Sequence, residues 1–454
     1  GDSALPAAEG LRVDGLDPKR FAQEANMGLV LAIDNLSPVF SWWVPPPPLQ
    51  FRGAQIVSTC VMIWEAEANE AFHTARFAGL VVSFRYQDVR NRNPLKPGSR
   101  YCYDVQYKTS DGDVAPRSEK ACFEMGLGNS DEAWEQSSWI GSDDLKVLRA
   151  DFEISPLLLQ KASSARLYVS GSWGQYYVNG ERISINESLG VGWTRYDKKC
   201  YYATYSILPL LNSSRNVLGA ALGQGWRDLA NFPPKFEADD LGFVLNPNTT
   251  EILPGRTEME GLLSKSPTWT SRVVRMLVKL RTSDGIWHTV AQTTGKESKG
   301  GRIGEQATTS RGSNGTTWQG TPGPVTFDSI FDGETYDARE AERIAGCFSP
   351  HYSPTNVSLW EDAPNVGAEA WAKRTIMVAQ PIPPIRPQET VAPLSIRLVG
   401  MSEDGKSGHF VIDFEKNRAG VCRVLLPKGK RGSNITIRHA EATMHAPYGY
   451  FGEN

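Results

Sequence analysis

The sequence lacks several features that would each indicate a defined class of protein. Its 454 residues contain 48 Lys and Arg against 51 Asp and Glu, so no basic excess favours nucleic acid or an anionic membrane as a partner. No apolar run approaches the roughly 18 residues of a membrane-spanning helix. The six cysteines contain no CxxC pair and the six histidines no HExxH pattern, so we expect no zinc site. We therefore expect neither nucleic acid nor membrane as a partner and no metal site.

Strand patterns dominate the sequence, most clearly between residues 165 and 227. Apolar residues alternate with small or polar ones up to Asn179-Gly180, a dipeptide that favours a two-residue hairpin turn. A tyrosine-rich alternation follows at 201–207, and the stretch ends in Gly223-Gln224-Gly225-Trp226. These three strands, punctuated by glycine, predict one face of a β-sandwich.

This stretch resembles the N-terminal β-sandwich domain of α-L-rhamnosidases, which has a tyrosine-rich strand, an NG hairpin, a PGWTDY-like turn and a GxGW ending. Here the turn at 191–196 reads VGWTRY, so the proline and aspartate usual in the family are replaced. The segment GETYDAR at 333–339 is nearly identical to the corresponding family segment. The resemblance covers essentially the whole chain.

The predicted fold is all-β, with three consecutive β-sandwich domains. Residues 1–127 resemble a fibronectin type III-like module, with an aromatic strand at 40–44 and a closing FEMGL segment. Residues 128–380 are expected to form a jelly-roll-like rhamnosidase N-terminal domain, with a surface loop rich in Gly, Ser and Thr at 293–322. Residues 381–454 resemble the first part of a concanavalin-like sandwich, in which 409–414 pairs with 421–426 and 435–441 forms a further strand.

The resemblance implies that the complete protein removes terminal α-L-rhamnose from glycosides with inversion. In the family the acid and base carboxylates lie in an α/α barrel that follows the region present here. No succession of long amphipathic helices occurs in this sequence, so we assign no catalytic residue. Glu334, Asp337 and Glu441 lie in family motifs, but we expect each to bond an arginine or loop amides. The sequence is thus interpreted as a non-catalytic N-terminal part, which requires a C-terminal catalytic-barrel portion on the same precursor or a second chain.

Aromatic and polar residues of the central domain form a candidate carbohydrate-binding set. Sugars stack on exposed aromatic rings, and Asn or Arg side chains bind their hydroxyls. The alternative is that the tryptophans are core residues at the edge of the sandwich. Some relatives contain a calcium-dependent rhamnose-binding module in this region, but no EF-hand-like run is present, so calcium is an option and no cofactor is required. The candidates are Trp173, Asn179, Trp193, Arg195 and Trp226.

The abundance of N-x-S/T triplets predicts a secreted, extracellular glycoprotein. Cys60, Cys102 and Cys122 all fall in the first domain, so one disulfide is expected there, with its pairing left open. A second hypothesis is a catalytically inactive carbohydrate-binding or structural module of an extracellular assembly. The altered turn at 191–196 and Glu415-Lys416, where the family more often has Gly-Gln, favour it slightly. The candidate glycosylation sites are Asn186, Asn212, Asn248, Asn314, Asn356 and Asn434.

Overall fold

The structure is a computed structural model that divides into two compact units, residues 1–385 and 386–454. Within the described residues, no helix has the length and apolar character needed to cross a membrane. The residues described are 5–21, 31–48, 51, 53–66, 72–87, 94–130, 132–135, 137–183, 185, 187–194, 196, 198–225, 272–294, 296–297, 317–329, 333–353, 359–366, 372, 375–425 and 432–440.

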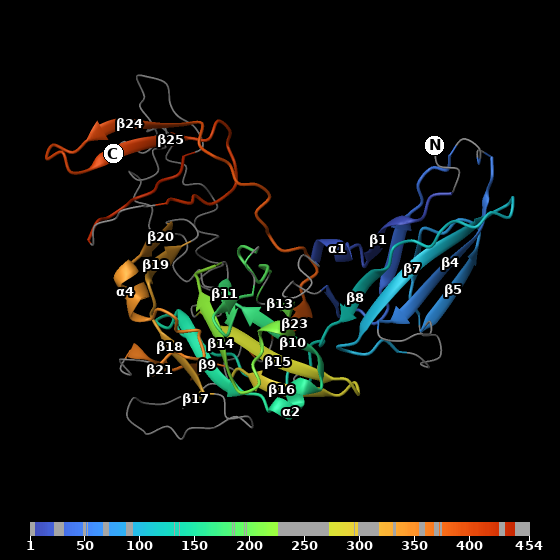
Figure 1. The fold of residues 1–454 in the computed structure, drawn as a ribbon, viewed down its shortest axis with the longest axis horizontal. Helices are drawn as coiled ribbons and strands as arrows, with labels where there is room; N and C mark the ends of the chain where they lie inside the picture. Colours follow the sequence, from blue (N-terminus) through green and yellow to red (C-terminus); the bar gives the residue numbers. More distant parts are fainter. Residues whose placement is uncertain are drawn as a thin grey trace, which may run out of the picture. The chain divides into compact units, whose positions relative to one another are not determined.

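The first unit begins with a β-sandwich of two sheets (Figure 1). Strands β1, β3 and β6 form one sheet, and the other has the order β2-β8-β7-β4-β5. Aromatic side chains fill the space between the sheets: the Phe40 ring stacks on Phe84 and meets Tyr103 edge-on. The elements are β1 (Glu9–Val13), α1 (Pro18–Phe21), β2 (Ala32–Ile33), β3 (Val39–Trp43), β4 (Ile56–Glu65), β5 (His73–Ala78), β6 (Ser83–Arg85), β7 (Arg100–Thr109) and β8 (Ala121–Met125).

The disulfide expected in this domain joins Cys102 to Cys122. These residues lie directly opposite each other on the antiparallel strands β7 and β8. The third cysteine of the domain, Cys60, is a free thiol on β4.

A second sandwich follows in the same unit. A five-stranded sheet has the order β16-β15-β10-β13-β23, and a six-stranded sheet has the order β12-β11-β14-β9-β18-β21. The elements are β9 (Val147–Glu153), α2 (Pro156–Gln160), β10 (Ala162–Gly171), β11 (Gly174–Val178), β12 (Glu181–Arg182), β13 (Lys199–Ser206), the 3₁₀ helix η2 (Leu208–Leu210), β14 (Arg215–Leu222), β15 (Val274–Thr282), β16 (Trp287–Gln292), β17 (Lys296–Glu297), β18 (Trp318–Thr321), β19 (Val325–Ser329), β20 (Gly333–Tyr336), α4 (Ala338–Arg343), β21 (Glu361–Asp362), β22 (Pro364–Asn365) and β23 (Ile376–Ala379).

The predicted hairpin at Asn179-Gly180 is confirmed, and both residues have positive φ, 53° and 91°. The prediction that residues 165–227 form one face is wrong, because β10 and β13 belong to one sheet and β11 and β14 to the other. The chain changes sheets just after Gly171, whose φ is 145°. A Cβ at this position would lie 2.2 Å from the Val273 carbonyl oxygen, so the crossing requires glycine.

The predicted surface loop at 293–322 is also wrong in part, since β17 and β18 lie within it. β18 pairs with β9 inside the six-stranded sheet, and the Trp318 side chain is buried. The Gly, Ser and Thr composition of the segment suggested a loop, but burial of the Trp318 indole and the strand preference of Thr317 and Thr321 favour a strand here.

The second unit contains one antiparallel pair, β24 (Ser395–Met401) with β25 (Gly408–Asp413). The prediction placed the partner of 409–414 at 421–426 and a further strand at 435–441. Neither segment forms a strand in its described part, and β25 pairs with β24 instead. Residues 402–407 connect β24 and β25 by a short loop, and a partner close in sequence costs the least entropy to bring together.

The segment after β20 covers the outer face of the six-stranded sheet. Phe348 stacks on Tyr177 of β11, with ring centroids 4.2 Å apart. Phe348 also lies against Gly219 of β14, where a Cβ would come within 2.1 Å of the phenyl ring. Phe348 can therefore pack on the sheet at this position only because residue 219 of β14 is glycine and has no side chain.

We expect Gly219→Ala to lower the free energy of unfolding by about 1–3 kcal/mol, because the new methyl group overlaps the Phe348 ring. Denaturant titration measures the change. Gly420→Ala is the control, since a Cβ there meets nothing within 4 Å. Adding Phe348→Leu to Gly219→Ala should recover part of the loss; additive losses would contradict this explanation.

Candidate functional site

The candidate site is centred on Trp173, in the connection between β10 and β11. The backbone carbonyl of Trp173 accepts a hydrogen bond from the Gly223 N–H at 2.8 Å. Gly225 lies flat on the indole, where a Cβ would be 2.8–3.1 Å from three ring atoms. The Gly-Gln-Gly sequence at the end of β14 thus lets the backbone approach one face of the ring.

Three charged side chains from separate parts of the chain meet beside this turn. The Arg272 guanidinium donates to Asp328 Oδ1 at 2.6 Å, and Lys146 Nζ lies 3.6 Å from the same oxygen. Asp328 Oδ2 accepts from the Gln224 backbone N–H. Arg272 also donates to the Asp143 carbonyl at 2.8 Å, and Lys146 to the Val325 carbonyl at 2.5 Å.

The three side chains of this triad are only 10–12% exposed, which removes most of their hydration. Burial lowers the pKa of the Lys146 ammonium, although the Asp328 carboxylate acts in the opposite direction. Burial raises the pKa of the neighbouring Asp143 carboxyl, and there Arg272 acts in the opposite direction. Asp328 therefore compensates two desolvated cations at once.

The site has more hydrogen-bond donors than acceptors. Trp173 Nε1 and Arg272 Nε are buried, and neither has a hydrogen-bond partner within the described part of the chain. Asp328, by contrast, already accepts hydrogen bonds from Arg272 and Gln224 and forms an ion pair with Lys146. Both N–H groups are buried, so they could donate to acceptor oxygens of a ligand only after the residues that cover them move. Because Asp328 is held by three donors, it is poorly suited to act as a general acid.

The described members of the predicted carbohydrate-binding set have different surroundings. Trp193 is 59% exposed, in a loop fixed by a 2.9 Å hydrogen bond from Gly192 N–H to Gln380 Oε1. The Asn179 side chain donates to the Leu210 carbonyl and to Asn216 Oδ1 and accepts from Val217 N–H. Asn179 therefore stabilises the hairpin connection.

Several other predictions fall outside the described residues: Arg195, Trp226, Glu441, Asn186, Asn248, Asn314 and Asn356. Of the predicted glycosylation sites, Asn212 and Asn434 are described, and both are exposed. No group of three or more His, Cys, Asp or Glu side chains suited to a metal ion occurs in the described ranges. Lys146, Arg272 and Asp328 were not predicted, because no local motif links residues so far apart in sequence.

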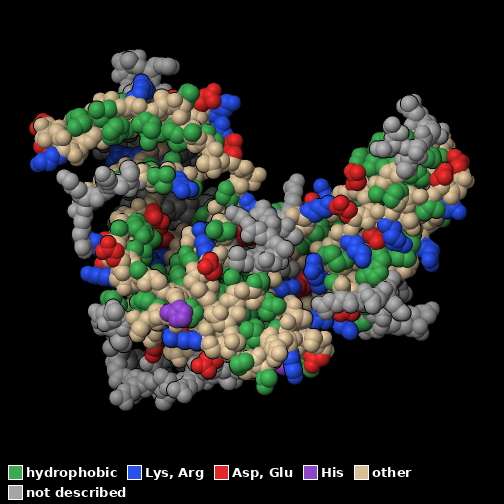
Figure 2. Space-filling model, viewed as in Figure 1, with side chains coloured by type: hydrophobic (Ala, Val, Ile, Leu, Met, Phe, Trp, Pro, Cys, Tyr) green, Lys and Arg blue, Asp and Glu red, His purple; other side chains and the backbone are tan. Residues whose placement is uncertain are grey.

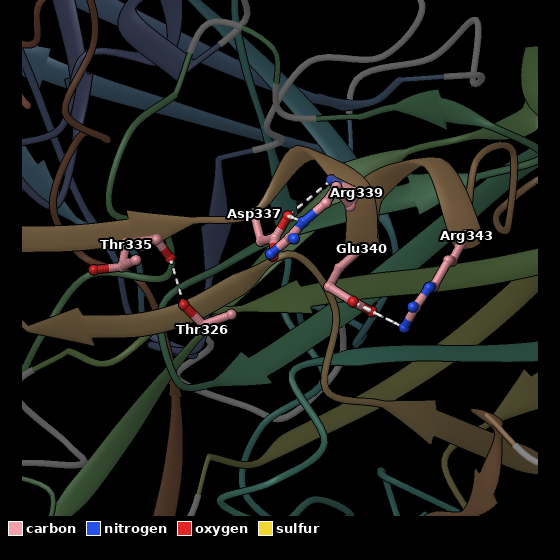
Figure 3. A network of polar contacts seen from close by, with 6 residues as sticks. All are labelled: Thr326, Thr335, Asp337, Arg339, Glu340 and Arg343. Carbon is pink, nitrogen blue, oxygen red and sulfur yellow. Dashed lines mark hydrogen bonds and ion pairs between the residues drawn. The ribbon is translucent and has the colours of Figure 1, made fainter. Parts of the chain in front are cut away.

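The GETYDAR motif forms the start of helix α4, and Figure 3 shows its polar contacts. Asp337 caps the helix by accepting from the Arg339 backbone N–H at 2.9 Å, and its carboxylate also accepts from the Arg339 guanidinium. These bonds, the side-chain one first, lower the pKa of Asp337 to about 2. Asp337 thus bonds an arginine side chain and an amide in the first turn of α4, and Glu334 lies on the fully exposed strand β20.

Family models match two parts of the chain. Residues 25–129 match the Rha78A-like N-terminal immunoglobulin domain, and residues 160–235 match the α-L-rhamnosidase N-terminal domain. The first domain is thus assigned to an immunoglobulin type, where the sequence predicted a fibronectin type III-like module; both are β-sandwiches.

Curated and solved relatives extend this similarity. An α-L-rhamnosidase of Alteromonas sp. (strain LOR) is 27% identical over 72% of this chain and 29% of its own length. One of Formosa agariphila is 23% identical over 91% of this chain and 39% of its own length. The solved α-L-rhamnosidase from Dictyoglumus thermophilum has a TM-score of 0.62 at 20% identity, over 92% of this chain and 39% of that one. That from Aspergillus terreus has a TM-score of 0.59 at 19% identity, over 90% and 39%.

The fold defines an all-β protein of successive β-sandwich domains, an immunoglobulin-like domain followed by a rhamnosidase N-terminal domain. The domain matches and the curated relatives support the α-L-rhamnosidase family for this chain, and the structural neighbours share its fold. The chain spans about two fifths or less of these two curated relatives.

We expect Asp328→Ala to lower the free energy of unfolding by about 3–5 kcal/mol, because it leaves two buried cations without their carboxylate. Denaturant titration of unit 1 measures this. Glu119→Ala removes the exposed ion pair with Lys19 and should have no measurable effect. Equal effects of the two substitutions would contradict the importance of burial.

The Asp337 cap should respond to acid. Because its folded pKa is depressed to about 2, its contribution is fully present above the unfolded value near pH 3.9 and is lost as pH falls through about 2. The NMR shift of the Arg339 amide should titrate with a midpoint near pH 2. Asp337→Asn should abolish the titration; a midpoint near 3.9 in the unchanged protein would disprove the cap.

Proposed function

We propose that this chain is the N-terminal, non-catalytic part of a secreted α-L-rhamnosidase-like glycoside hydrolase. The complete protein would remove terminal α-L-rhamnose from a rhamnosylated glycan or glycoside by inversion. The relatives named α-L-rhamnosidase support this, since two of them align over most of the chain and over 29–39% of their own lengths. The acid and base carboxylates would come from a C-terminal catalytic portion, on the same precursor or a second chain.

The observation that carries the proposal is the one-sided surface of the second unit. Cross-strand pairing sets Ile396 opposite Ile412 and Leu398 opposite Phe410, so all four side chains lie on one face of the β24–β25 hairpin. They are 47–61% exposed, and Figure 2 shows hydrophobic side chains gathered on this hairpin. A two-stranded hairpin with an exposed apolar face is marginal alone and needs a second layer. Further strands of a longer polypeptide would supply that layer.

Secretion fits the cross-strand disulfide Cys102–Cys122, because disulfides persist in oxidising compartments. Asn212 and Asn434 are both exposed, as glycosylation requires.

A second candidate function is carbohydrate binding by a catalytically inactive module. It is supported by the Trp173 ring, which is only partly buried and whose buried Nε1 has no hydrogen-bond partner in the described part of the chain. Trp193 offers an exposed ring, but the apolar Ile382 side chain lies beside its neighbour Gly192. We take Trp173, which lies beside the charged triad, as the sugar-stacking residue to be tested against Trp193, and calcium is not needed for this arrangement.

The first function is tested by the intact mass of the natural material under denaturing conditions, with and without reductant. We expect this sequence to be accompanied by a catalytic-barrel portion, and the material to cleave a chromogenic α-L-rhamnoside. A single inactive chain whose mass is 50.1 kDa plus its glycans would contradict the enzyme and favour the binding module.

The second function is tested by titrating the chain with L-rhamnose and recording NMR shifts or heat. If Trp173 stacks the sugar, Trp173→Phe should weaken binding about tenfold or less, as a smaller ring loses part of the stacking. Trp193→Phe should leave affinity unchanged. Loss with Trp193→Phe alone would move the site to the 191–196 turn, and the absence of any binding would disprove this function.

A further inference from the structure

We propose that Asp34 of the N-terminal domain is a strap that fastens β23, the last strand of the central sandwich, in place. Asp34 directly follows β2, and its carboxylate reaches into the central domain. Oδ1 accepts from the Tyr202 hydroxyl at 2.6 Å and from the Gly128 backbone N–H at 3.1 Å. Oδ2 accepts from the Ala379 backbone N–H at 2.7 Å. One carboxylate thus joins the domain linker, β13 and β23.

β23 is a weak element by itself. It has four residues and, among the described strands, forms the edge of the five-stranded sheet and pairs with β13 alone, in parallel. Parallel pairing is slightly less stable per residue than antiparallel pairing. An edge strand also leaves a row of backbone groups without sheet partners.

Asp34 satisfies one of those edge groups. The Gln380 N–H donates to the Tyr202 carbonyl, so the preceding Ala379 N–H points away from β13. This outward N–H is the one that Asp34 Oδ2 accepts. A hydrogen bond to a carboxylate is stronger than one to a neutral acceptor. The strap therefore replaces the missing neighbouring strand at this position.

The surroundings fix the carboxylate in this position. Tyr202 is buried, and its hydroxyl also accepts from the Leu127 N–H at 2.9 Å. At Gly126 a Cβ would lie 2.2 Å from both Asp34 Oδ1 and the Tyr202 hydroxyl oxygen, so only glycine allows this approach. The three donors require two acceptor oxygens. An asparagine offers one oxygen and an NH₂ group, so it cannot replace the aspartate.

Two consequences follow for the chain. The Asp34 contact to β23 exists only while the N-terminal domain is folded and docked on the central domain, although Asp34 and Ala379 are separated by 345 residues in sequence. β23 also leads directly into the proline-rich segment that begins at Pro381, so the strap sets where that segment starts.

Hydrogen exchange of the full 454-residue chain, read by NMR or by mass spectrometry of peptides covering residues 375–380, tests the strap. Asp34→Asn should raise the exchange rate of the Ala379 amide and of β23 about tenfold or more, the effect of one lost charge-assisted bond. β10 and β15, in the same sheet, should keep their protection.

Asp14→Asn is the matched control. The Asp14 carboxylate accepts from Asn35 and from the Val39 N–H, both inside the N-terminal domain. It should leave β23 unchanged. The proposal is wrong if Asp34→Asn leaves β23 protected, if Asp14→Asn releases β23 equally, or if the whole sheet accelerates together. Should Asp34→Asn fail to fold, the unchanged protein decides: an Ala379 amide that exchanges at the unprotected rate would overturn the strap, and strong protection would support it.

Discussion

The close approach of three backbone segments at the start of β15 is the constraint on which the central domain depends. Val274 exchanges two backbone hydrogen bonds with Ile140, at 2.9 and 3.0 Å, while the Val273 carbonyl accepts from Ser172 at 2.8 Å. Gly141 and Gly171 flank this strand start, and a Cβ on either would come within 2.2 Å of a carbonyl oxygen. Any side chain there would push β15 outward. The position of Arg272, one residue earlier, follows from this packing.

That packing explains why a charged triad exists inside a sandwich. The start of β15 brings Arg272, the start of β9 brings Lys146, and the β19–β20 hairpin brings Asp328. Each ion would be costly alone in a site with little water, so the three are stable only together. The triad also ties the hairpin to the Gly-Gln-Gly turn through the Gln224 N–H. The same contacts that build the candidate site therefore stabilise the domain.

The joint between the first two domains uses the same chemistry. Besides Asp34, the buried Glu124 carboxylate of β8 receives the Arg166 guanidinium of β10 at 2.9 Å. Trp287 packs beside Gly98, so apolar and polar contacts both cross the joint. Buried, fully bonded charges specify one arrangement, because any displacement leaves a charge without a partner. The second unit differs, since its strand pair exposes its apolar face.

The sequence alone determined the all-β class, the NG hairpin, the expectation of a disulfide in the first domain and the family resemblance. All of these depend on patterns within short stretches, where alternation, turn residues and motifs act locally. The sequence patterns wrongly predicted that β10 and β11 share a sheet and that the segment containing β18 is a loop. The sheet change at Gly171 and the burial of Trp318 both depend on residues distant in sequence, so local patterns do not indicate them. The sugar candidates were likewise chosen by proximity in sequence. The tertiary structure shows that Asn179 stabilises the hairpin and is not part of the Trp173 turn. It also brings Lys146, Arg272 and Asp328 together, which the sequence did not indicate because ion pairing acts through space and leaves no local pattern.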